Sequence, residues 1–149
     1  MRQTLLLPGI AGLALALFLS LAVPTYAETT QFKADLMAAS EVPPNQSTGT
    51  GTVTATYDSA TKQLSWKGTF SGLTGPATAA HFHGPAEPGK NAGVVLWIST
   101  KGAPFTSPFQ GSATLTDAQA SDLMDGRFYV NIHTAANPGG ELRGQLNKM

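Results

Sequence analysis

The sequence contains no cysteine among its 149 residues. This absence excludes disulfide bonds, thiolate metal sites, cysteine nucleophiles and redox pairs. It also excludes the attachment of a lipid to a cysteine near the N-terminus. Such a chain has to be stabilised by its hydrophobic core, for which about 120 residues are sufficient.

Charged residues are scarce and balanced, with nine basic and nine acidic side chains making up 12% of the chain. There is no basic cluster of the kind that binds nucleic acid or anionic lipid. Common catalytic signatures are also missing: the sequence has no G-x-S-x-G motif and no phosphate-binding glycine loop after a strand. We therefore expect a protein that is not an enzyme and that has no nucleic-acid partner.

A long apolar run occurs only near the N-terminus, from Leu5 to Val23. Arg2 precedes the run, and Thr25-Tyr26-Ala27 places small residues where a signal peptidase cleaves. The pattern predicts a Sec-type signal peptide at 1–27, a secreted or periplasmic location, and no membrane contact after cleavage. Retention of the run as a membrane anchor is the alternative, because its length approaches that of a span. Residues 28–149 are then expected to form a single domain.

The rest of the chain is rich in Thr, Gly, Ala and Pro, and its apolar residues mostly alternate with polar ones. Alternation of this kind predicts short β-strands separated by turns. The clearest hairpin spans 52–70, with its turn at 58–61. The continuous apolar stretch 93–98 predicts a central strand that is covered on both faces. This stretch belongs to an expected strand at 93–99. The other expected strands are 31–39, 77–83, 109–115, 127–134 and 141–146.

One short helix is predicted at 117–124. Thr116 and Gln119 have the spacing of a capping box, and Gly126 suits the C-terminal cap. About eight strands with regularly spaced turn signals predict an all-β fold. We expect a Greek-key β-sandwich or a flattened barrel with this one helix.

The three histidines of the sequence are His81 and His83, in an H-F-H triplet, and His133. Residues two apart on a strand point to the same face, so His81 and His83 project together, opposite Phe82. In the strand 127–134, His133 alternates with apolar residues in the same way. The pattern places all three imidazoles on polar, water-facing sides of their strands.

Three imidazoles without a thiolate suit copper or zinc, and we favour copper. Asn131, Glu141 and Arg143 are expected beside them on the same face. Glu141 is a candidate to accept a proton from the far nitrogen of one ring, or to bind the metal itself.

The same residues also fit an extracellular structural or protein-interaction domain without metal. In that alternative the His, Asn, Glu and Arg side chains form a hydrogen-bonded brace or a contact surface. An enzyme that uses an open metal position is the remaining alternative, with Glu141 as its one identifiable acid or base.

Several motifs of the chain resemble those of the CHRD (chordin) domain family, in family order from about Phe32 to Leu146. An opening element resembles "L-x-G-x-x-E-V-P-P", a second resembles "A-H-I-H-x-G", a third resembles "G-x-N-G-P-V-V", and a long closing block resembles "G-x-x-Y-V-N-V-H-T … P-x-G-E-I-R-G-Q". The first three elements are 36–44, 78–86 and 91–95, and the closing block comprises 126–134 and 137–146.

The resemblance implies a stand-alone exported domain of bacterial type, and it places the three histidines inside the family's motifs. The family takes its name from an animal antagonist of growth-factor signalling, but the cysteine-rich modules of that protein are absent here. The H-x-H strand is also similar to the copper-binding strand of Cu/Zn superoxide dismutases. Three histidines are too few for that two-metal cluster, so dismutase activity is not expected.

Overall fold

The structure is a computed structural model that describes residues 28–149. The predicted signal peptide, 1–27, lies outside the described residues. Within the described part of the chain, no helix has the length and apolar character needed to cross a membrane.

The described chain is mostly β-structure, with one short α-helix and one 3-10 turn. Its elements are β1 (Thr29–Met37), η1 (Ala38–Ser40), β2 (Thr50–Asp58), β3 (Gln63–Ser71), β4 (Ala77–His83), β5 (Val94–Trp97), β6 (Phe109–Thr114), α1 (Asp117–Met124), β7 (Tyr129–Thr134), β8 (Leu142–Gln145) and β9 (Asn147–Lys148).

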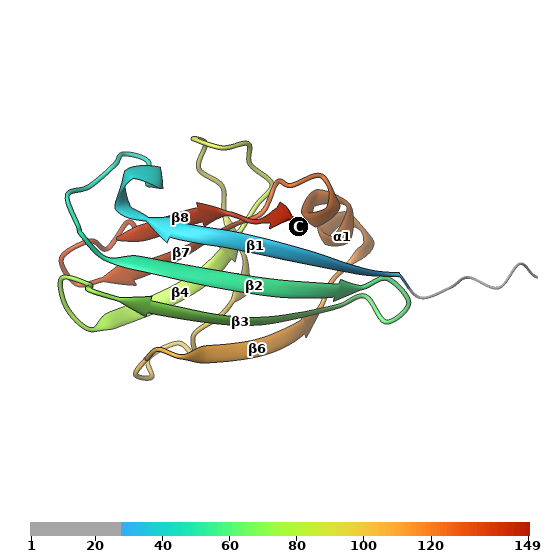
Figure 1. The fold of residues 1–149 in the computed structure, drawn as a ribbon, viewed down its shortest axis with the longest axis horizontal. Coiled ribbons are helices and arrows are strands. Elements are labelled where there is room, and N and C mark those ends of the chain that lie inside the picture. Colours follow the sequence, from blue (N-terminus) through green and yellow to red (C-terminus); the bar gives the residue numbers. More distant parts are fainter. Residues whose placement is uncertain (1–27) are drawn as a thin grey trace, which may run out of the picture.

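The strands form one antiparallel sheet that curls into a nearly closed, flattened barrel. Its strand order is β5-β4-β7-β8-β1-β2-β3-β6, and β9 pairs with β1. In Figure 1, β1, β2, β3 and β6 form the front layer, and β8, β7 and β4 cross behind them. The predicted all-β class with a flattened barrel is confirmed.

The hairpin predicted at 52–70 is confirmed as β2 and β3, which pair over their full length. The carboxylate of Asp58 accepts hydrogen bonds from the backbone N–H groups of Ala60 and Thr61, at 2.9 and 2.8 Å. Such a side-chain turn reverses the chain without disturbing the alternation of either strand. The hairpin therefore presents one apolar face to the other layer.

The predicted helix is confirmed as α1, together with its caps. Thr116 accepts a hydrogen bond from the backbone of Gln119, and the Gln119 side chain accepts one from the backbone of Thr116. Gly126 follows the helix with φ of 73°, a conformation that costs other residues more than glycine.

A hydrophobic core fills the space between the two layers. Trp66 on β3 meets Phe82 on β4 edge to face, with ring centroids 5.1 Å apart, so the core joins the layers directly. Phe82 is fully buried, which fixes the H-F-H strand with its histidines on the opposite face. Other fully buried members are Phe32, Val53, Leu64, Phe128, Val130, Ile132, Leu142 and Leu146.

The prediction of a central strand at 93–98 was wrong. β5 lies at one end of the strand order and pairs with β4 alone. Val94 and Trp97 are 46% and 47% exposed, whereas Val95, Leu96 and Ile98 pack against the core. A run of apolar residues does not distinguish an edge strand that packs on one side from a strand that is covered on both.

Candidate metal centre

The three histidines come from two neighbouring strands, β4 and β7. These strands pair in antiparallel register, with His81 opposite Asn131 and His133 opposite Ala79. His133 is therefore the diagonal neighbour of His81 on one face, a spacing that side chains can bridge. The strand pairing, which one sequence does not reveal, brings the H-x-H pair and the third histidine together.

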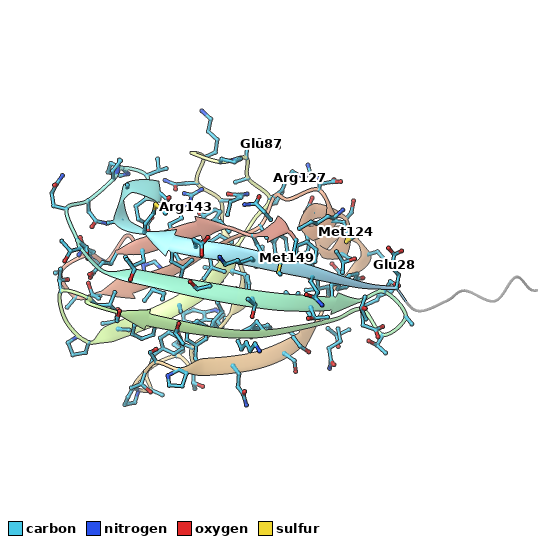
Figure 2. All side chains as sticks on the ribbon, viewed as in Figure 1. Glu28, Glu87, Met124, Arg127, Arg143 and Met149 are labelled. Carbon is cyan, nitrogen blue, oxygen red and sulfur yellow. The ribbon has the colours of Figure 1, made fainter. Side chains whose placement is uncertain are left out.

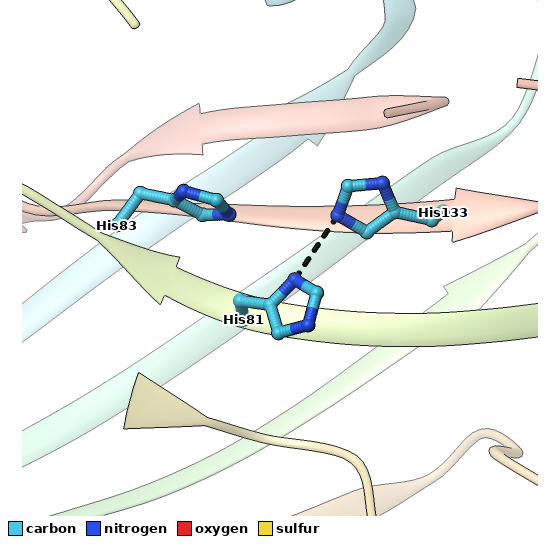
Figure 3. A group of neighbouring side chains, drawn as sticks. All are labelled: His81, His83 and His133. Atoms are coloured by element: carbon cyan, nitrogen blue, oxygen red, sulfur yellow. Dashed lines mark hydrogen bonds between the residues drawn. The ribbon is translucent and has the colours of Figure 1, made fainter. Parts of the chain in front are cut away.

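The rings converge on one point (Figure 3). Nδ1 of His81 lies 3.1 Å from Nε2 of His133, and one nitrogen from each of the three rings lies within 4.8 Å of the others. Two nitrogens bound to one tetrahedral zinc ion are roughly 3.3–3.4 Å apart. The pair from His81 and His133, at 3.1 Å, is already close to this spacing.

Backbone carbonyl groups orient the outer nitrogens of two rings. Nδ1 of His83 donates to the carbonyl of Ala92 at 3.0 Å, and Nδ1 of His133 donates to that of Pro138 at 2.9 Å. Because a carbonyl oxygen only accepts, each Nδ1 carries the proton and each Nε2 carries the lone pair. Metal-binding histidines in proteins have this arrangement, with the outer N–H on a carbonyl or carboxylate.

In the metal-free protein, His81 forms a hydrogen bond with His133. Its Nδ1 faces the lone pair of His133 and so donates a proton to it. Nε2 of His81 and Nε2 of His83 are then buried lone pairs without a partner. Unpartnered polar atoms in a protein interior call for an explanation, and an ion bound to Nε2 of His83 would supply one. Nε2 of His81 points away from the other two rings (Figure 3), so an ion at the point of convergence would bind Nδ1 of His81 after its proton has left.

The environment of His81 and His133 favours their neutral form. Burial, together with the neighbouring His133 and His83, lowers the pKa of His81 to about 4. Burial also lowers the pKa of His133, against the opposing effect of its bond to Pro138. Neutral imidazole is the form that binds metals, so these two rings are in the binding form at neutral pH.

The expectation of water-facing histidines was wrong. His81 and His83 are 7% and 8% exposed, and only His133 is partly exposed. Strand parity correctly puts them on the side away from Phe82, but the loops that carry Ala92 and Pro138 pack over this side. The histidines are therefore enclosed between a strand pair and two loops.

Aromatic rings and a cation surround the group. Trp97 on β5 pairs with His81 in register, and the two rings meet at 87° with centroids 4.2 Å apart. Tyr129 stacks on His83, and the guanidinium carbon of Arg143 lies over the Tyr129 ring, 3.5 Å from its centre. Sequence reasoning missed Tyr129 and Trp97 as parts of the site, although the parity of Tyr129 with His133 indicates its face.

Arg143 is a structural support of the loop over His83. It is 2% exposed, and it donates to the Lys90 carbonyl and to the side-chain oxygen of Asn91. In Figure 2 it lies on the same side of the molecule as the neighbouring loop residue Glu87. Because Ala92 follows in the same loop, Arg143 helps to place the carbonyl that orients His83.

Glu141 and Asn131 contact no histidine ring through a hydrogen bond. The Glu141 carboxylate is fully buried and accepts five hydrogen bonds. The donors are Ser47 before β2, Thr74 (twice) before β4, Thr134 at the end of β7 and Asn137 in the loop after it. The expectation that Glu141 orients a ring or binds the metal is therefore not met, and it acts as a brace. Asn131 lies between His81 and Arg143 in register, and its side-chain oxygen has no partner.

Glu41 is a buried acid that sequence reasoning did not connect with this region. Burial raises its pKa to about 7, although Arg143 and Asn131 act in the opposite direction. A Cβ added to Gly140 would overlap the Glu41 carboxylate, which shows how closely the two residues pack. The loop after His133 thus contacts Glu41 through Gly140 and Glu141 through Asn137.

We predict that Gly140→Ala lowers the free energy of unfolding by about 1–3 kcal/mol. Gly140 has φ of 136°, and an added Cβ would also lie 2.8 Å from Nδ2 of Asn131. Urea unfolding measures the change. Gly139→Ala is the matched control, because a Cβ there meets nothing within 4 Å. Equal stability of the two variants would contradict this account of the loop.

Fold and site together define a class: an all-β, barrel-like domain whose sheet encloses three convergent histidines on the face away from its core. The CHRD domain family model matches residues 32–146, and the chain belongs to this family. Comparisons with curated proteins and with solved structures find no match.

Proposed function

We propose that this CHRD domain is an exported binding module that holds one copper ion through His81, His83 and His133. The observation that carries the proposal is the convergence of one nitrogen from each ring within 4.8 Å, while carbonyl groups hold the outer nitrogens of two rings. An exported location is supported by the signal-like segment 1–27.

Copper is favoured over zinc by the order of affinities of nitrogen sites for divalent ions. The site also lacks the thiolate ligands that structural zinc sites commonly use, because the chain has no cysteine. The protein's role would then lie in holding or transferring copper outside the cytoplasm.

The test is a calorimetric titration of the metal-free protein with Cu(I) in the absence of oxygen, and with Cu(II) and Zn(II). We expect one equivalent to bind, and the triple variant His81→Ala, His83→Ala, His133→Ala to lose at least 100-fold in affinity. Circular dichroism of the variant checks that the β-fold is kept. Because the chain has only three histidines, a residual site elsewhere would have to use other ligands.

Thermal unfolding gives an independent readout. A ligand that binds only the folded state at 1,000 times its Kd adds about 4 kcal/mol of stability, so copper should raise the melting temperature clearly. An unchanged copper affinity in the triple variant, or no binding of copper to the wild type in either oxidation state, would overturn the proposal. The second result would favour the alternative of a metal-free domain in which the histidine hydrogen bonds only brace two strands.

A further inference from the structure

The ligand set of the proposed site carries no negative charge. Among residues 28–149, no aspartate or glutamate joins the three histidines in a metal-binding group. Two buried acids lie in the same region, but Glu141 is engaged in its five hydrogen bonds, and Glu41 is not part of the metal-binding group. A bound ion would therefore keep its full charge inside the protein.

The surroundings make that charge costly. His81 and His83 are more than nine-tenths buried, and the energy of moving an ion out of water rises with the square of its charge. On the far side of His83, the Tyr129 ring is stacked with the Arg143 guanidinium, which brings a positive charge close to the site. Both effects disfavour a divalent ion far more than a monovalent one.

The number of ligands also favours a monovalent ion over a divalent one. Cu(II) prefers a tetragonal set of four or more ligands, and zinc is generally tetrahedral. The described residues supply three nitrogens, and a filled d shell allows Cu(I) to be satisfied by three. A monovalent copper ion thus needs neither an acidic ligand nor an added one.

Trp97 covers the ligand that lies nearest the sheet edge. Its ring meets the His81 ring at 4.2 Å between centroids, and its other side is exposed on the edge strand β5. An indole in this position keeps water from His81 without adding charge. Removing the indole would admit water, which solvates a divalent ion more strongly than a monovalent one.

We infer that the three-histidine site is specific for monovalent copper, Cu(I), and that Trp97 is a specificity-determining residue that enforces this choice. The inference rests on the proposed function, because it names the ion that the same site takes.

The test compares wild type with Trp97→Ala, Trp97→Phe and Val94→Ala. Val94 is also exposed on β5 and pairs with His83, so its variant controls for truncation of the edge strand. Cu(I) affinity is measured without oxygen by competition with bathocuproine disulfonate, Cu(II) affinity by competition with nitrilotriacetate, and Zn(II) affinity by competition with a chromophoric chelator. Voltammetry of the copper-loaded protein gives the Cu(II)/Cu(I) preference directly.

We expect wild type to bind Cu(I) at least 100-fold more tightly than Cu(II) or Zn(II). Trp97→Ala should reduce the Cu(I) preference about tenfold, which lowers the potential of bound copper by about 59 mV. Trp97→Phe and Val94→Ala should stay within a factor of three of wild type. This pattern is not expected if Trp97 only stabilises the strand, because lost stability would weaken both oxidation states alike.

Equal affinity of the wild type for Cu(I) and Cu(II), or an unchanged potential in Trp97→Ala, would overturn the inference while leaving copper binding intact. Absence of binding in either oxidation state would overturn the proposed function as well. The two failures are therefore separate experimental results.

Discussion

Glu141→Ala is expected to lower the free energy of unfolding by about 3–5 kcal/mol, the range for removing one partner of a buried charged network. The Glu141 carboxylate is fully buried and accepts five hydrogen bonds, so the variant leaves their donors without an acceptor. A buried donor without a partner costs about 1–3 kcal/mol, although the vacated space admits water to some of these donors. Urea unfolding at pH 7 measures the loss.

The isosteric variant Glu141→Gln separates charge from volume. Its amide nitrogen cannot accept a hydrogen bond, so it should lose part of the stability lost by the alanine variant, about 2–3 kcal/mol. Glu87→Ala is the control, because Glu87 is an exposed acid and its removal should change stability by less than about 0.5 kcal/mol. A cost below 1 kcal/mol for Glu141→Ala would contradict the role of Glu141 as the brace of three loops.

The donors to Glu141 show where sequence reasoning ends. Ser47 and Thr74 lie 94 and 67 residues away from Glu141 along the chain. The alternation of 141–146 indicates only that Glu141 points away from the core. It does not indicate whether a residue on that face contacts water or is covered by loops. The loops that cover it come from other parts of the sequence, and no local pattern indicates where they fold.

Local features were predictable because their causes are local. The turn at Asp58 and the capping box at Thr116 depend on residues within three positions of each other, and both are present. The hairpin register follows from the same alternation on β2 and β3. Elements of this kind are specified by residues that are close together in the sequence.

The candidate site was predictable in composition but not in environment. The alternation around His81, His83 and His133 identifies one face of each strand, and the strand pairing makes these faces continuous. Burial of that face, and the contact of Trp97 with His81, depend on how the 84–98 segment folds back as an edge strand. Composition alone cannot tell such an edge strand from a central one.

The dependence of stability on pH should reveal three buried groups of the metal-free protein. Burial and neighbouring histidines lower the pKa of His81 from 6.5 to about 4. Burial alone would raise the pKa of Glu141, but hydrogen bonds from Ser47, Thr134 and Thr74 lower it from 4.5 to about 2. Burial raises the pKa of Glu41 from 4.5 to about 7.

The sign of each contribution follows from which state binds more protons. The unfolded state protonates first at His81, so its contribution is complete above pH 6.5 and is lost as the pH falls to about 4. Glu141 behaves in the same way between pH 4.5 and about 2. Glu41 has the opposite sign: its contribution is complete below pH 4.5 and is lost as the pH rises through about 7.

We expect the wild type to show a nearly flat stability between pH 4.5 and 6.5, because the contributions of His81 and Glu41 oppose each other there. Each shift of about 2.5 pKa units corresponds to about 3 kcal/mol. Below pH 4.5, the loss at Glu141 should make stability fall steeply. Urea unfolding at a series of pH values, with a chelator present, measures the profile.

Glu41→Gln should unmask the histidine contribution. An amide does not titrate, so the stability of this variant should rise by about 2–3 kcal/mol between pH 4.5 and 6.5, where the wild type stays level. The lowered pKa of His133 adds to the rise. The fall below pH 4.5 should be the same in both proteins, because Glu141 is unchanged. Superimposable profiles above pH 4.5 would show that Glu41 is not protonated in the folded protein, and would contradict a pKa raised by burial.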